Sequence, residues 1–287
     1  MSYSAMQASL PMYDFPEVRE ATNAWWQGIA KHMRQQGIEN VPAHLTTELP
    51  LDQLWTGDEL FLSQCCGFDV MNSYKDHLSV LMISDWDAEG CETGQYCSLV
   101  IVHEDSPHNH LADLKDSIAV INGPESHSGM NALFSAIQPH SVDGQFFKEI
   151  HISGAHADSL RFVQNKQADI AAIDNVTFAL LKRYRPSAIN GVRVLCQTKS
   201  APALPYVTSI NTGLETQKQM QAALQAAFDD PDWAESRETL LLRGGIFPDL
   251  SYGQHPYSSS ENPYREIADG FTFDRRLLEP MVAIKTI

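Results

Sequence analysis

Short apolar runs alternate along the chain with polar, glycine-containing segments and with stretches of helical periodicity. The stretch after Pro16 is typical of an amphipathic helix, with one apolar face at Val18, Ala21, Trp25, Ile29 and Met33. The apolar runs predict strands at residues 8–12, 60–62, 77–83, 98–103, 117–121, 150–153, 169–174, 192–197 and 206–210. Helices are predicted at residues 129–137, 158–165 and 176–185, and after residue 210 with a face of Met220, Leu224, Ala227 and Phe228. This alternation favours an α/β fold with mainly parallel sheets, and the Ser-, Pro- and Tyr-rich stretch 251–262 is expected to be irregular.

Length and charge limit the function classes. The 287 residues suffice for one large domain or two ordinary ones, and 43% of them are hydrophobic. No run reaches the ~18 consecutive apolar residues of a membrane helix, and no signal peptide is predicted at the start of the sequence. The net charge of −16 disfavours binding to nucleic acid or anionic lipid. An anion site in such a chain must rely on backbone amides, hydroxyls and helix termini.

The five cysteines form no disulfide framework, because their number is odd and their spacing irregular. Cys91 and Cys97 could pair in an oxidising compartment, although buried free thiols are the favoured state. The adjacent Cys65 and Cys66 do not form a redox motif, and a catalytic thiol is not expected there.

The most informative segment is Ile121-Asn122-Gly123-Pro124-Glu125-Ser126-His127-Ser128-Gly129-Met130-Asn131. A strand, a glycine-containing turn and two serines at a helix start can cradle an anion, because free amides and the positive end of the helix dipole point outward. The simpler alternative is that Ser126 or Ser128 only caps the helix. The segment has neither the P-loop pattern nor the dinucleotide-binding fingerprint.

Two further strand ends carry polar candidates. His156 lies between a strand and a helix and could donate to an anion, or it is an ordinary loop histidine. Asp174 ends an apolar strand, at the sheet edge where ligands of α/β proteins bind, or it caps the next helix. Ser126 or Ser128 could form a nucleophile–base–orienter set with His156 and Asp174, but a hydrolase is disfavoured because no G-x-S-x-G elbow is present.

A metal site is not expected. The densest group of potential ligands lies in one polar connector that is predicted to be a solvated loop, and it comprises His103, Glu104, Asp105, His108 and His110.

An ordered set of motifs resembles the phosphonate-type substrate-binding proteins of ABC transporters. The match runs from about residue 10 to residue 228, and upstream it includes Pro11-Met12-Tyr13-Asp14 and Ser63-Gln64-Cys65-Cys66-Gly67-Phe68, where the family usually has Tyr at the position of Phe68. The remaining matches are residues 111–115, 119–122, 124–133, 154–156 with Ser159, 168–174 and 204–209. The tail beyond Phe247 matches nothing in this pattern.

The resemblance implies a type II periplasmic-binding-protein fold, in which two α/β lobes are joined by two crossing hinge strands and close on a ligand. The crossings are expected near residues 100–103 and 195–198. Lobe 1 would then comprise residues 1–101 and 199–287, and lobe 2 residues 102–198.

The resemblance also implies a ligand site in the inter-lobe cleft. In lobe 2, the expected contacts with an anionic head group come from Ser126, His127, Ser128 and Gly129, with His156 and Asp174 beside them. Asp174 would be able to meet an amine or hydroxyl of the ligand. The expected closing residues are Tyr13, Gln64, Cys65, Cys66, Phe68, Tyr96 and Tyr206.

The sequence thus predicts a solute-binding protein of an ABC-type uptake system for a phosphonate- or phosphate-ester-like ligand. We expect no catalysis and no cofactor, and an ABC permease as the partner of a protein that is not embedded in the membrane. The resemblance predicts a periplasmic location, whereas the absence of a visible signal peptide leaves a cytosolic enzyme or metabolite sensor on the same fold as the alternative.

Overall fold

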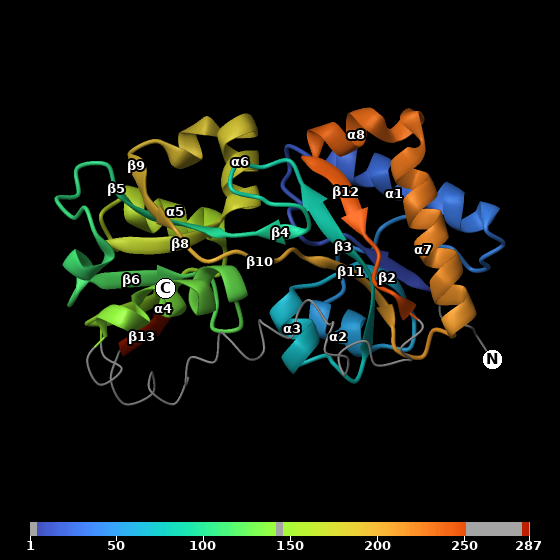
Figure 1. Cartoon of the computed structure of the whole chain (residues 1–287), viewed down its shortest axis with the longest axis horizontal. Helices are drawn as coiled ribbons and strands as arrows, with labels where there is room; N and C mark the ends of the chain where they lie inside the picture. The colour runs from blue at the N-terminus through green and yellow to red at the C-terminus, as the bar shows by residue number, and fades with distance from the viewer. Residues whose placement is uncertain (1–4, 142–145, 251–282, 287) are drawn as a thin grey trace. The chain divides into compact units, whose positions relative to one another are not determined.

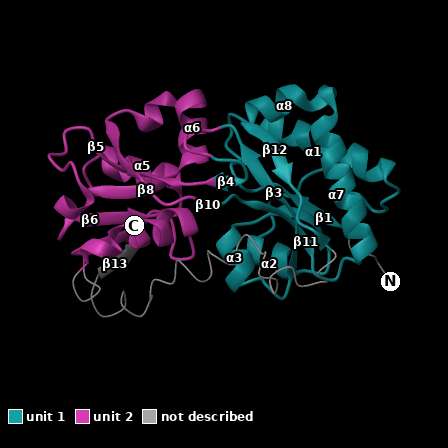
Figure 2. Ribbon diagram, in the orientation of Figure 1, with its two compact units in different colours: residues 1–87, 92–95, 202–265 teal, residues 88–91, 96–201, 266–287 magenta. Residues whose placement is uncertain are grey.

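The computed structural model describes residues 5–141, 146–250 and 283–286 (Figure 1). These residues form two compact units (Figure 2). Within the described residues, unit 1 comprises residues 5–87, 92–95 and 202–250, and unit 2 comprises residues 88–91, 96–141, 146–201 and 283–286. No helix in the described part of the chain is both long and apolar enough to span a membrane.

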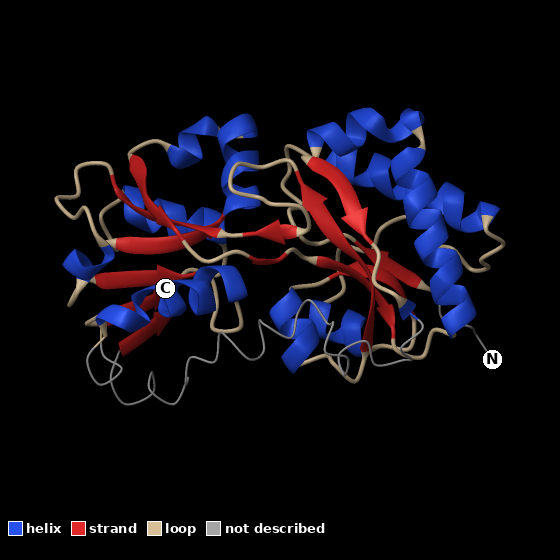
Figure 3. Ribbon diagram, viewed as in Figure 1, coloured by secondary structure: helices blue, strands red, loops and turns tan. Residues whose placement is uncertain are grey.

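Unit 1 is built on a five-stranded sheet with the order β1-β2-β11-β3-β12. Its strands are β1 (Gln7–Ser9), β2 (Leu60–Gln64), β3 (Leu78–Trp86), β11 (Pro205–Ser209) and β12 (Leu242–Ile246). β1 and β2 are parallel, whereas the other neighbours are antiparallel. The helices around this sheet (Figure 3) are α1 (Arg19–Gln35), α2 (Leu51–Thr56), α3 (Gly67–Asn72), α7 (Leu214–Asp229) and α8 (Ala234–Thr239).

Helix α1 has the apolar face that the sequence predicts. Trp25, Ile29 and Met33 are fully buried, and the ring of Trp25 lies 4.9 Å from that of Phe228 on α7. The helix ends just before Gly37, whose φ of 77° favours glycine. All five tryptophans of the chain lie in unit 1.

Unit 2 contains a six-stranded sheet with the order β13-β7-β6-β8-β5-β9. Its strands are β5 (Ser98–His103), β6 (Ile118–Ile121), β7 (Glu149–Ile152), β8 (Ile170–Asp174), β9 (Val192–Gln197) and β13 (Ala283–Thr286). β13, β7, β6 and β8 run parallel, and β5 is antiparallel to both β8 and β9. Its α-helices are α4 (Ala132–Ile137), α5 (His156–Gln164) and α6 (Asn175–Tyr184). The π-helix η2 (His127–Asn131) leads directly into α4. The large sheet of each unit is therefore mixed, whereas the sequence pattern favoured mainly parallel sheets.

The remaining elements are short. The described residues also contain four 3₁₀ turns, at Leu111–Leu114, Gln138–His140, Pro186–Ile189 and Pro231–Trp233. The two-residue strands β4 (Gln95–Tyr96) and β10 (Ala201–Pro202) each contain one point at which the chain changes unit.

The lobe boundaries differ from those expected from the sequence. The main changes of unit fall at 95/96 and 201/202, after a short passage of residues 88–91 into unit 2, whereas crossings were expected near residues 100–103 and 195–198. The physical reason is that β5 and β9 pair with each other along their length inside the sheet of unit 2. The C-terminal strand β13 also differs from expectation, because it pairs with β7 of unit 2. The predicted irregular stretch 251–262 lies outside the described residues.

Candidate functional site

A π-helical turn forms the last part of the predicted anion-binding segment of unit 2. Strand β6 ends at Ile121, and Ser126 caps η2 by accepting a hydrogen bond of 3.0 Å from the Gly129 amide. His127, Ser128 and Gly129 are buried in this turn. The sequence predicts a helix from residue 129, and the structure begins it two residues earlier as a π-helix, a geometry frequent at functional sites.

The structure brings Ser128 and His156 together. Ser128 Oγ lies 2.9 Å from His156 Nε2, and His156 is the first residue of α5. The backbone carbonyl of Ser128 accepts a hydrogen bond of 2.9 Å from Ser98 Oγ, at the start of β5. Ser98 is buried and was not predicted as a site residue, because an isolated serine at a strand start carries no distinctive signal.

Both histidines of the site are held neutral. Burial lowers the pKa of His127 to about 4, and desolvation likewise lowers the pKa of His156 to about 4. The ring of Tyr96 lies 6.1 Å from that of His127, and Tyr96 is itself buried. At neutral pH the two imidazoles are therefore polar groups without net charge.

Asp174 lies at the carboxyl end of β8, as predicted. Its Oδ1 caps α6 by accepting a hydrogen bond of 2.8 Å from the Thr177 amide. Asp174 is directly opposite Ser98 in the antiparallel β5–β8 ladder. Ser98 therefore pairs with Asp174 in the sheet and donates a hydrogen bond to Ser128 in the π-helical turn.

A glycine is required in the turn because of a neighbour that the sequence analysis missed. An ideal Cβ on Gly129 would lie 1.8 Å from Asn122 Oδ1 and 3.3 Å from His156 Cε1. Asn122 Oδ1 and Asn131 Nδ2 are buried polar atoms without a hydrogen-bond partner among the described residues. Such atoms are available to a polar ligand, and none of the contacts of this turn given above comes from a lysine or arginine.

In unit 1, four of the predicted residues lie in β2, in α3 or between them, and Tyr206 lies in the adjacent β11. Gln64 is opposite Tyr206 in the β2–β11 ladder, and the Cys65 amide donates to Pro205 O at 3.1 Å. Cys65 is fully buried, and Cys66 precedes α3, to which Phe68 belongs. Burial raises the pKa of the Cys65 thiol well above its ordinary value.

Tyr206 and Tyr13 have different surroundings. Tyr206 is only 1% exposed, and its hydroxyl accepts a hydrogen bond of 3.0 Å from Trp25 Nε1. Tyr13 has a φ of 66°, and its ring packs edge-on against that of Trp86 at 4.9 Å. The left-handed backbone at Tyr13 directs the chain away from β1 into α1.

The polar connector 103–110 has local partners. His103 Nδ1 accepts a hydrogen bond from the Asp105 amide, and Asp113 accepts two from the amides of Asn109 and His110. Within the described ranges, no three or more His, Cys, Asp or Glu side chains are arranged to hold a metal ion.

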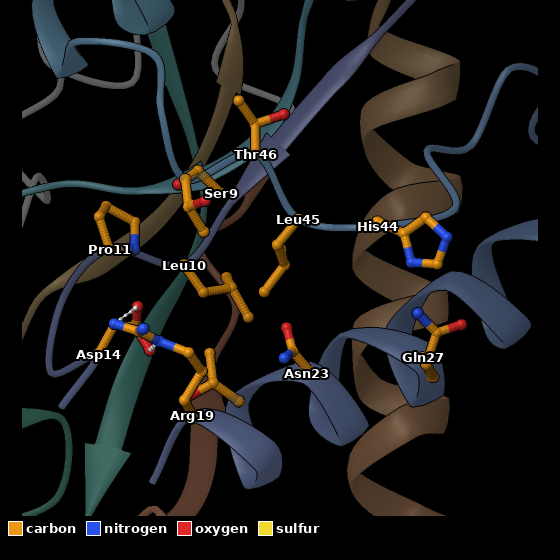
Figure 4. Close-up of a pocket in the computed structure, with 12 residues that line it drawn as sticks. Ser9, Leu10, Pro11, Asp14, Arg19, Asn23, Gln27, His44, Leu45 and Thr46 are labelled. Atoms are coloured by element: carbon orange, nitrogen blue, oxygen red, sulfur yellow. Dashed lines mark hydrogen bonds and ion pairs between the residues drawn. The ribbon is translucent and has the colours of Figure 1, made fainter. Parts of the chain in front are cut away.

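A separate recess of about 450 Å³ lies in unit 1 between α1 and the segment at residues 44–47 (Figure 4). Its walls are mainly polar, and Arg19 pairs with Asp14 at 3.3 Å across one end. None of its lining residues was predicted to belong to the ligand site, although the recess includes Pro11 and Asp14, close to Tyr13 in sequence.

Comparison with protein families decides the assignment. The model of a family described as the periplasmic substrate-binding proteins of phosphonate ABC transporters matches residues 58–244, which is well over half of the chain. The chain belongs to this family. Members of this phosphonate-binding family act as solute-binding proteins of ABC uptake systems, and the predicted function and resemblance are thereby confirmed. The matched range contains every predicted ligand residue except Tyr13.

Solved structures support the fold. XAC2383 from Xanthomonas citri bound to ATP is 14% identical, with a TM-score of 0.70 over 96% of this chain and 99% of that one. PhnD1 from Prochlorococcus marinus in complex with methylphosphonate is 13% identical, with a TM-score of 0.70 over 96% and 97%. A binding component of an ABC phosphonate transporter from Pseudomonas aeruginosa is 16% identical, with a TM-score of 0.66 over 96% and 95%. A comparison with curated proteins found no match.

These similarities confirm the α/β fold of the type II periplasmic-binding-protein class. The family is periplasmic, and its members bind small ligands and work with ABC permeases.

Proposed function

We propose that this protein captures a phosphonate or phosphate ester and holds the anionic head group at the π-helical turn of unit 2. The contact between Ser128 Oγ and His156 Nε2 carries the proposal. After the end of β6, the Ser128 hydroxyl and the His156 imidazole lie together at the start of an eleven-residue helical segment formed by η2 and α4. The first amides of this segment belong to the same turn. Neutral donors and a helix dipole suit an anion that is bound without lysine or arginine.

The proposed head-group contacts are Ser126, His127, Ser128, Gly129 and His156. Asp174 would meet a donor group on the organic part of the ligand. We further propose that Tyr13, Tyr96, Tyr206 and the segment from Gln64 to Phe68 contribute the remaining contacts. For Tyr206 this role would be indirect, because its hydroxyl already accepts from Trp25. A ligand with an organic part, rather than bare phosphate, suits so many aromatic side chains.

We propose that the protein performs this role in the periplasm, together with an ABC permease, and returns its ligand unchanged. The Ser128–His156 contact also has the geometry of a nucleophile and a base, which is the observation that favours a hydrolase as second candidate. Asp174, the third member of that set, instead caps α6. Its capping role is a simpler account of Asp174 than the orientation of a catalytic histidine.

A thermal-shift screen of the purified protein tests the proposed ligand class. The panel contains phosphate, phosphite, alkyl- and aminoalkyl-phosphonates, phosphate esters, sulfonates and carboxylates. A ligand at a hundred times its Kd stabilises the folded state by ~2.7 kcal/mol, which raises the melting temperature measurably. No rise with any phosphonate or phosphate ester would overturn the proposal.

Variants locate the site once a ligand is found. Ser128→Ala should weaken binding by ~1.5–3 kcal/mol, roughly tenfold to somewhat over a hundredfold, if Ser128 Oγ donates to the anion. Ser187→Ala, at an exposed serine of the same unit, is the matched control and should leave affinity unchanged. Recovery of the ligand with an unchanged mass supports binding, whereas its hydrolysis would favour the second candidate.

A further inference from the structure

Two cysteines of unit 2 flank a short excursion of the chain. Cys91 ends the segment 88–91, the chain then belongs to unit 1 for residues 92–95, and it returns at Tyr96 and Cys97. Cys91 is half-buried and Cys97 is buried. Neither thiol has a role in the proposed ligand site.

The side chain of Asn175 contacts both cysteines. Its Oδ1 accepts a hydrogen bond of 3.3 Å from the Cys97 amide, and its Nδ2 donates to Cys91 Sγ at 3.1 Å. The Asn175 amide also donates to the Cys97 carbonyl at 3.0 Å. One carboxamide therefore holds the backbone of one cysteine and the sulfur of the other.

A glycine leaves room for the second sulfur. An ideal Cβ on Gly90 would lie 3.1 Å from Cys97 Sγ and 3.5 Å from Asn175 Nδ2. Both thiols thus border the same small space around Gly90 and the Asn175 amide. The φ of 84° at Gly90, which favours glycine, turns the segment so that Cys91 faces this space.

We propose that Cys91 and Cys97 form a disulfide that closes the 92–95 excursion. The half-buried Cys91 reacts first: its thiolate attacks a disulfide oxidant, a mixed disulfide forms, and one thiolate of the oxidant leaves. The Cys97 thiolate then attacks Cys91 Sγ and expels the second. Two thiols and one oxidant disulfide become one protein disulfide and two reduced thiols, and both protons end on the reduced oxidant.

The surroundings of the pair indicate a slow reaction. Burial raises the pKa of Cys91 to about 12 and that of Cys97 to about 11, and the nearby Asp174 carboxylate acts in the same direction. A small thiolate fraction slows both attack steps at neutral pH.

The other three cysteines lie in other surroundings. Cys196 packs against the apolar cluster of unit 2, and Cys65 and Cys66 belong to unit 1. Cys196 therefore serves as the internal control.

The test is to incubate the purified protein with oxidised glutathione and count free thiols by maleimide labelling under denaturing conditions. The expected result is three reactive thiols in place of five, a mass loss of about 2 Da, and a cross-linked peptide joining residues 91 and 97. Cys196→Ser should still form the cross-link, whereas Cys91→Ser should form no internal cross-link and should keep the buried Cys97 as a free thiol. Asn175→Ala, which releases both contacts, should slow the reaction.

Five free thiols after prolonged oxidation of the wild-type protein, or a cross-link through any other pair, would overturn the proposal. The measurement needs neither ligand nor transporter, so its outcome is independent of the proposed ligand class.

Discussion

Replacement of Gly129 by alanine tests whether the tight packing of the π-helical turn is real. The new Cβ would lie 1.8 Å from Asn122 Oδ1, and contacts below 3.0 Å are essentially never seen for real Cβ atoms. The Asn122 carboxamide must therefore retreat by at least 1.2 Å. Asn122 Oδ1 is buried, and the new Cβ would also lie 3.3 Å from His156 Cε1, so contacts on two sides of the turn must adjust.

The magnitude follows from two opposing effects. Overpacking of a buried site costs ~1–3 kcal/mol. Alanine in place of glycine in a helix recovers roughly 0.5–1 kcal/mol, because φ at Gly129 is not positive. We expect a net loss of about 1–2 kcal/mol in the free energy of unfolding, together with weaker binding of a phosphonate found in the screen.

The assay is urea unfolding followed by two probes. Tryptophan fluorescence reports only on unit 1, because all five tryptophans lie there, whereas far-UV circular dichroism reports on both units. The loss should be seen in the circular dichroism transition. Gly123→Ala is the matched control in the same turn, since nothing lies within 4 Å of its ideal Cβ, and it should change stability by less than about 0.5 kcal/mol.

A double-mutant cycle identifies the cause. In the Asn122→Ala background the same Gly129→Ala change should cost little, because the clashing carboxamide is gone. An equal loss in both backgrounds, or a Gly129→Ala protein as stable as wild type, would refute the packing argument.

Three further predictions concern unit 1 and metals. Tyr206→Phe strands the buried Trp25 Nε1 and should cost ~1–3 kcal/mol in urea unfolding, whereas no change would mean that the bond adds nothing. Arg243 lowers the pKa of Asp85, so the stability this ion pair adds is present above the ordinary Asp pKa and is lost as pH falls through the lower folded value. The urea midpoint should therefore fall less in Asp85→Asn than in wild type from pH 5 to pH 3, and parallel falls would contradict this. Ligand-induced thermal shifts should persist in EDTA, and their loss would reveal a required metal.

Much of the secondary structure is predictable from apolar periodicity. The face of α1 and the strand ends at Ile121 and Asp174 follow from local spacing, because these elements bury one side and their boundaries carry turn or cap residues. The boundaries between the two units could not be predicted from such local patterns. Strand pairing between β5 and β9 is non-local, and nothing in either segment alone shows that it belongs wholly to one unit.

The site could be predicted in its segments and not in its contacts. The serines and His156 stand out because they follow strands, and the structure joins Ser128 to His156. The π-helical register, the dependence of Gly129 on Asn122 and the use of Ser98 arise from packing between distant segments. The same holds for Tyr206, whose burial against Trp25 depends on how a strand and a helix 181 positions apart meet.

The low pKa values of His127 and His156 have a consequence for the pH range over which the charge of the site stays constant. In the ligand-free protein neither ring changes its charge between pH 5 and 8. The electrostatic potential that the pair contributes is then the same in mildly acidic and mildly alkaline water. A change of ligand affinity across this pH range would therefore reflect the ionisation of the ligand or of other groups, and not the titration of these two rings in the free protein.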